Sequence, residues 1–113
     1  MAAIKALFFG AFITHMLFSN VVLATDKIND NRKAELKNLL LQDCGSCHGM
    51  TLKGGLGPAL TTDIMDSRSR EYLFTTISEG RPGTPMPPWK NLLSGDEINW
   101  IIDTLYRGVN HVN

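Results

Sequence analysis

The chain has 113 residues, of which 11 are basic and 11 acidic, so its formal net charge is zero at pH 7. That length has room for one small domain, and the lack of a basic stripe argues against a nucleic-acid partner. Hydrophobic residues make up 43% of the sequence, which excludes an intrinsically disordered chain.

Residues 1–24 have the features of a secretory signal peptide. Lys5 gives the segment a positive start, an apolar run follows over residues 6–13, and Val22-Leu23-Ala24 offers small residues for a signal peptidase. The alternative is an uncleaved membrane anchor. Polar side chains interrupt the apolar stretch, however, whereas a transmembrane helix needs about 20 mostly apolar residues. We therefore expect cleavage and export.

The first predicted helix follows a short polar stretch. Residues 25–31 are expected to form a flexible leader. The spacing of Leu36, Leu39 and Leu40 then predicts a helix from Arg32 to about Asp43, with these leucines on its buried face.

A second helix is predicted over residues 69–78. Leu73 and Ile77 share one of its faces, and Gly80 is placed to end it. Residues 81–89 hold four prolines and one glycine, so this segment is expected to be irregular.

The third predicted helix has the best-marked start. Ser94 and Glu97 match a capping box, in which each side chain accepts a hydrogen bond from the backbone of the other residue. Gly108 marks the end of the helix, and its apolar stripe consists of Ile98, Ile101, Ile102 and Leu105. No strand is predicted. We therefore expect a small all-α domain over residues 32–108, followed by a tail over residues 109–113.

The run Cys44-Gly45-Ser46-Cys47-His48 has the spacing of a covalent haem attachment motif. Two intervening residues let the sulfur atoms of Cys44 and Cys47 bond two vinyl groups along one side of the porphyrin. The next residue, His48, is then carried beneath the iron as the proximal ligand. The sequence therefore predicts one covalently bound haem c.

Two other kinds of site use such cysteines. A redox-active disulfide normally opens a helix within a βαβ pattern, which this sequence does not show. A zinc site needs four ligands, whereas the two cysteines are accompanied after the signal segment only by His48 and by His111, a residue expected in a solvated tail. The motif and the export signal together favour haem.

Met86 is the expected second axial ligand of the iron. Met50 follows His48 too closely to bind from the opposite side of the haem, and Met65 is expected to be a packing residue. Met86 stands between prolines, whose fixed backbone angles reduce the entropy lost when the loop binds iron. An open or histidine-ligated iron is the alternative. With both axial positions filled, an electron carrier is expected rather than an enzyme.

With these motifs in view, residues 32–108 resemble the class I cytochromes c. The likeness rests on the haem motif, on Gly57-Pro58, on Met86-Pro87 and on the aliphatic last helix. It implies three main helices and loops wrapped around one haem, with the first and last helices crossing. It also implies that the carbonyl of Pro58 accepts a hydrogen bond from the His48 ring.

Trp89 is a further candidate for contact with the haem. Its side chain is expected either to pack in the core of the ligand loop or to donate a hydrogen bond to a haem propionate. Core packing is favoured, since a buried indole N–H commonly seeks a partner anyway.

More narrowly, residues 43–58 and 80–89 resemble cytochrome c of the 55X type, which is encoded beside the cytochrome cd nitrite reductase of denitrifying bacteria. This resemblance implies a periplasmic electron carrier in denitrification, with no membrane anchor after cleavage and with that reductase as its partner. The alternative is an accessory electron-transfer protein in haem d biosynthesis or reductase maturation, whose partner would be a haem d maturation protein.

Overall fold

The computed structural model describes residues 28–111, and all regular structure within that range is helical. The all-α prediction is therefore confirmed. The expected signal peptide at residues 1–24 lies outside the described residues, as do residues 25–27 of the leader and residues 112–113 of the tail. Within residues 28–111, no helix is both long and apolar enough to cross a membrane.

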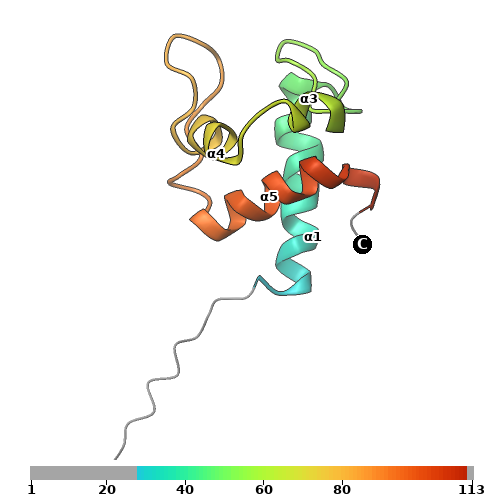
Figure 1. Cartoon of the computed structure of the whole chain (residues 1–113). Coiled ribbons are helices and arrows are strands. Elements are labelled where there is room, and N and C mark those ends of the chain that lie inside the picture. Colours follow the sequence, from blue (N-terminus) through green and yellow to red (C-terminus); the bar gives the residue numbers. More distant parts are fainter. Residues whose placement is uncertain (1–27, 112–113) are drawn as a thin grey trace, which may run out of the picture.

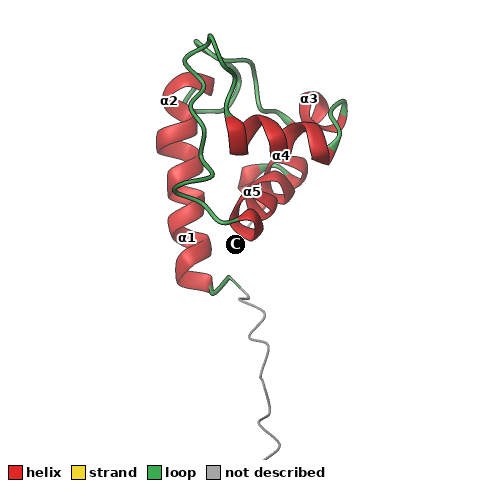
Figure 2. Ribbon diagram, turned by 90° about the vertical axis from the view of Figure 1, so that its left-hand side faces the viewer, coloured by secondary structure: helices red, strands yellow, loops and turns green. Residues whose placement is uncertain are grey.

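The first helix is continuous and consists of three consecutive segments, and Figure 2 shows it along one edge of the molecule. The helix α1 (Asp30–Leu39) runs into a π-helical turn, η1 (Leu40–Cys44), and then into the short helix α2 (Gly45–His48). The haem attachment motif is therefore helical throughout.

The first helix begins earlier than predicted because Asn29 caps it. The Asn29 side chain accepts a hydrogen bond from the backbone N–H of Arg32 at 2.8 Å, which satisfies one of the amides that a helix start leaves free. Asp30 and Asn31, which we expected in the leader, thus form the first turn of α1.

The first helix also ends later than predicted, at His48 rather than near Asp43. Gly45 and Ser46 are weak helix formers, but Gly45 is buried and the Ser46 hydroxyl donates to the carbonyl of Asp43 at 2.6 Å. The helix stops at Gly49, which has a φ of 90°, a conformation that glycine adopts without steric cost. Tertiary packing has therefore outweighed local propensity.

The short helix α3 (Thr62–Asp66) was not predicted from the sequence. Five residues are too few to show a hydrophobic period. Its single buried apolar side chain is Met65, which is 3% exposed. The expectation that Met65 is a packing residue is confirmed.

The helix α4 (Arg70–Glu79) agrees with the predicted second helix. The Ser69 hydroxyl accepts a hydrogen bond from the backbone N–H of Tyr72 at 3.2 Å and so caps its start. The helix ends at Gly80, where φ is 68°.

The helix α5 (Gly95–Arg107) starts with the predicted capping box. The Ser94 hydroxyl accepts from the Glu97 amide at 3.3 Å, and the Glu97 carboxylate accepts from the Ser94 amide at 2.7 Å. After Gly108, a single 3₁₀ turn (Val109–His111) brings Val109 against the core. The part of the expected tail that the structure describes is therefore ordered.

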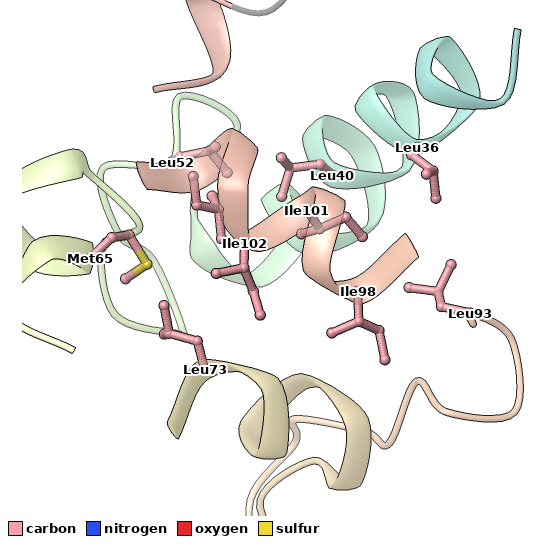
Figure 3. Packing of buried hydrophobic residues seen from close by; sticks show 10 residues of the cluster. Leu36, Leu40, Leu52, Met65, Leu73, Leu93, Ile98, Ile101 and Ile102 are labelled. Atoms are coloured by element: carbon pink, nitrogen blue, oxygen red, sulfur yellow. The ribbon is translucent and has the colours of Figure 1, made fainter. Parts of the chain in front are cut away.

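The core forms where α5 crosses the first helix, as Figure 1 shows. Leu36 and Leu40 from the first helix face the apolar stripe of α5 (Figure 3), and both are fully buried. The helices α3 and α4 contact the same α5. The buried cluster consists of Leu36, Leu40, Leu52, Met65, Leu73, Leu93, Ile98, Ile101, Ile102 and Leu105. The implied crossing of the first and last helices is thus confirmed.

An ion pair ties the start of α5 to the start of α1. The Glu97 carboxylate accepts a hydrogen bond from Arg32 Nε at 2.5 Å while it also caps α5. Its side chain is only 15% exposed. The hydrogen bond from Arg32 lowers the pKa of Glu97 below the usual 4.5. The ionised carboxylate therefore stabilises the folded state.

Replacing the Glu97 carboxylate should make the free energy of unfolding vary less with pH in the acidic range. Glu97→Gln keeps a side chain suited to the capping box but removes the charge, and we expect the variant to lose at most about 1 kcal/mol at pH 7. The pKa of Glu97 is lower in the folded state than in the unfolded state. The extra free energy of unfolding that wild type has over Glu97→Gln is therefore complete above about pH 5, and it disappears as the pH falls through the folded pKa.

The measurement is urea unfolding of the purified protein, followed by far-ultraviolet circular dichroism at several pH values. Glu35→Gln is the matched control, since Glu35 pairs with the same Arg32 but its side chain is 64% exposed. It should leave the free energy of unfolding nearly unchanged. If the free energies of unfolding of wild type and Glu97→Gln differ by the same amount from pH 7 to about pH 3, the ionised Glu97 carboxylate does not stabilise the folded state as described.

Candidate functional site

The helical conformation of the motif places its three reactive side chains on one face of the helix. Cys44, Cys47 and His48 occupy positions i, i+3 and i+4, which lie on one face of a helix. All three are partly buried, and both cysteines are free thiols. The two sulfur atoms and the imidazole can therefore act on one bound group.

The loop after the motif orients the histidine ring. His48 Nδ1 lies 2.7 Å from the carbonyl oxygen of Pro58. A carbonyl oxygen can only accept a hydrogen bond, so Nδ1 carries the hydrogen and Nε2 keeps a lone pair for a metal. The contact implied by the family resemblance is present in the structure.

Backbone hydrogen bonds fold this loop back against the end of the helix. The amide of Gly54 donates to the His48 carbonyl at 2.8 Å, and the amide of Gly57 donates to the Cys47 carbonyl at 2.7 Å. A Cβ atom on Gly57 would lie 2.8 Å from both Cε1 and Nδ1 of the His48 ring. Only glycine leaves the ring enough room in this position.

The segment that carries Met86 is closed by its own hydrogen bonds. The amide of Arg81 donates to the Met86 carbonyl at 3.1 Å. The Thr84 hydroxyl donates to the Arg81 carbonyl at 2.6 Å and accepts from the Met86 amide at 3.3 Å. We did not identify Thr84 from the sequence, although a threonine two residues before its target is a known turn signal.

The same segment packs tightly against the end of α4. The Trp89 amide donates to the Ile77 carbonyl at 3.0 Å. A Cβ atom on Gly80 would lie only 2.6 Å from the Met86 carbonyl oxygen. Gly80 thus lets the ligand segment pass close to the helix, a role that sequence reasoning also missed.

Met86 and Trp89 are both partly buried. Trp89 packs against the hydrophobic core, as the favoured prediction required. Within residues 28–111 the hydrogen bonds of Trp89 are made by its backbone alone, so its indole N–H is available to a bound group. The segment with Met86 and the loop after the motif project to the same end of the molecule, above α5 in Figure 1.

Comparison with known proteins identifies the family. Residues 31–103 match the family described as cytochrome C oxidase, cbb3-type, subunit III. Over 86 residues the chain is 54% identical to cytochrome c55X of Pseudomonas aeruginosa, covering 76% of this chain and 72% of the relative. Over 77 residues it is 51% identical to cytochrome c55X of Stutzerimonas stutzeri, covering 68% of each.

A solved structure agrees with these relatives. The c-type cytochrome NirC superposes with a TM-score of 0.69 at 55% identity, covering 71% of this chain and 94% of that one. The chain is a class I cytochrome c of the c55X family. Cytochromes c of this family are electron carriers rather than enzymes, so the chain works with a redox protein as its partner.

The residues at the site fit the one covalent haem c that this cytochrome carries. The structure offers two free thiols for thioether bonds and an imidazole whose Nε2 is free. Gly57, which has no side chain, leaves room for that imidazole ring. When bound, the haem supplies an iron that changes between the ferrous and ferric states.

The structure disfavours the two other kinds of cysteine site. Burial raises the pKa of the Cys44 thiol to about 11, whereas redox-active dithiols depend on a lowered thiol pKa. In the described part of the chain, no three His, Cys, Asp or Glu side chains gather to hold a metal ion. Neither a thioredoxin-type disulfide nor a zinc site matches this geometry.

The close approach of Gly57 to the His48 ring leads to a direct test. Gly57→Ala puts a methyl group where the ring lies and should displace it from Pro58, which we expect to cost about 2 kcal/mol of unfolding free energy. The yield of haem-loaded protein should fall with it. Both are measured on protein expressed together with haem-ligation machinery, by urea unfolding and by Soret absorbance.

Gly45→Ala is the matched control, because the nearest atoms to its added methyl lie at an ordinary 3.6 Å. An alanine within the helix should leave stability unchanged or raise it by up to about 1 kcal/mol. If Gly57→Ala behaves like Gly45→Ala in both measurements, the ring is not held as described.

Proposed function

We propose that this cytochrome c is a periplasmic electron carrier that delivers electrons to the cytochrome cd nitrite reductase in denitrification. The observation that supports this most is the 54% and 51% identity to cytochromes c55X, since the 55X-type cytochromes that residues 43–58 and 80–89 resemble are encoded beside that reductase. The signal-like segment at residues 1–24 supports a periplasmic location.

We propose that Cys44 and Cys47 form the thioether bonds and that His48 and Met86 are the axial ligands of the iron. The hydrogen bond from His48 Nδ1 to Pro58 supports the proximal assignment, because it fixes the ring and strengthens Nε2 as a ligand. Trp89 borders the Met86 segment and has an N–H available for a propionate.

The closed Met86 segment suits an electron carrier. A thioether is a weak ligand, and a segment already ordered by its own hydrogen bonds loses little entropy when its sulfur binds iron. Methionine ligation favours ferrous iron and so raises the reduction potential. With His48 and Met86 both bound to it, the iron would exchange electrons and would have no open position for a substrate.

Removing the thioether of Met86 tests its role. Met86→Leu should abolish the long-wavelength charge-transfer band of methionine-ligated ferric haem and lower the reduction potential by on the order of 0.1 V. Optical spectroscopy and redox titration measure the two effects. Met50→Leu is the control, since the Met50 side chain is 58% exposed and should change neither value. A charge-transfer band that survives in Met86→Leu would assign the ligand to another residue.

The proposed partner can be tested by reconstitution. The reduced cytochrome is mixed with purified cytochrome cd nitrite reductase and nitrite, and oxidation is followed by the loss of its ferrous absorption bands. We expect oxidation on the timescale of reductase turnover, and none when the reductase is left out. If the complete mixture leaves the cytochrome reduced, the carrier role is wrong and the accessory role in haem d biosynthesis takes its place.

A further inference from the structure

Two arginines converge on one exposed tyrosine at the base of the Met86 segment. The guanidinium carbon of Arg68 lies 5.4 Å from the centre of the Tyr72 ring, a distance typical of a cation–π contact. Arg81 Nη1 donates to the Tyr72 hydroxyl at 3.2 Å. Tyr72 itself is 40% exposed, so the whole cluster faces solvent.

These two arginines differ from most of the other basic side chains. Four of the other basic side chains in the described range pair with carboxylates, in the pairs Arg32–Glu97, Lys33–Asp30, Arg70–Asp103 and Lys90–Glu79. Neither Arg68 nor Arg81 has a carboxylate within ion-pair distance among residues 28–111. Glu71 is the neighbour of Tyr72 in sequence, yet it pairs with neither. The cluster therefore presents two positive charges that form no ion pair within residues 28–111.

Main-chain contacts hold both arginines in place. The Tyr106 hydroxyl donates to the Arg68 carbonyl at 2.9 Å, which fixes Arg68 to α5. The Arg81 amide is bonded to the Met86 carbonyl. Because the Tyr72 oxygen accepts from Arg81, its own hydrogen remains free to donate. The cluster thus offers two guanidinium groups and one hydroxyl as hydrogen-bond donors beside the segment that carries the proposed iron ligand.

We infer that Arg68, Tyr72 and Arg81 form a docking surface for a carboxylate cluster on an acidic redox partner. Arginine and tyrosine are the residue types that most often dominate binding energy at protein interfaces, and guanidinium groups bind carboxylates through paired hydrogen bonds. This inference rests on the proposed carrier function, but it does not depend on which acidic protein is the partner.

The number of charges favours a protein over a lipid surface. Recognition of anionic membranes typically needs a cluster of about 4–8 basic residues, and this surface has two. Two fixed charges are enough to speed and orient a transient encounter. Since the whole chain has no net charge, such local steering must come from a cluster of this kind.

Titration with hexaglutamate tests the surface without any partner protein. In ¹⁵N-labelled ferrous haem-loaded cytochrome at low salt, amide shifts should concentrate at residues 68–72 and at Arg81, and they should vanish in about 0.3 M NaCl. Arg81→Gln should weaken hexaglutamate binding about threefold. Arg107→Gln removes an exposed arginine elsewhere and should have no effect.

Three results would overturn the inference. The first is a set of shifts that avoids these residues, and the second is equal weakening by Arg107→Gln. The third is binding to phosphatidylserine vesicles that depends on Arg81, which would make the surface a lipid site. Arg81→Gln must also leave the reduction potential and the methionine charge-transfer band unchanged, since a change in either would assign Arg81 to the haem.

The same variants connect the surface to function. Arg81→Gln should slow oxidation by the nitrite reductase about threefold at low salt and match wild type at high salt. Equal rates at low salt would contradict a role in docking to that enzyme. If wild type is not oxidised at all, the proposed reductase partner is wrong, while the hexaglutamate titration still decides whether the surface binds acidic groups.

Discussion

The fixed position of His48 is the constraint on which the rest of the site depends. The residue is held from two directions, by the helix that carries Cys44 and Cys47 before it and by the loop that returns to it through Pro58 and Gly54. One short stretch of chain therefore carries both proposed points of covalent attachment and the proposed proximal ligand. Any group bound to the two thiols has its orientation set by the helix.

The segment that carries Met86 is likewise ordered by the fold itself. The Met86 segment is closed by Thr84, and Gly80 lets it lie against the end of α4. Both proposed ligands thus come from segments that the fold has already arranged. Little rearrangement of these segments would be needed when a bound iron changes oxidation state, which is what a carrier requires. The arginine cluster adjoins the Met86 segment, so partner binding and electron transfer would use neighbouring residues.

The parts predicted from the sequence are those that depend on local interactions. The helices α4 and α5 have side-chain caps at their starts and glycines at their ends, α5 has a clear apolar face, and the attachment motif is contiguous. The continuation of the first helix through Gly45 depends on burial, and α3 is too short to show a pattern. The contacts of Gly57 with His48 and of Gly80 with Met86 join segments that only tertiary packing brings together.

The proposed function requires a haem that is covalently bound to Cys44 and Cys47. Its most direct test is the intact mass of the exported protein, expressed with haem-ligation machinery and recorded with its optical spectrum. We expect a polypeptide heavier by the mass of one haem, with Soret absorption that stays with the denatured chain. A mass equal to that of the amino acids alone, without Soret absorption, would contradict it.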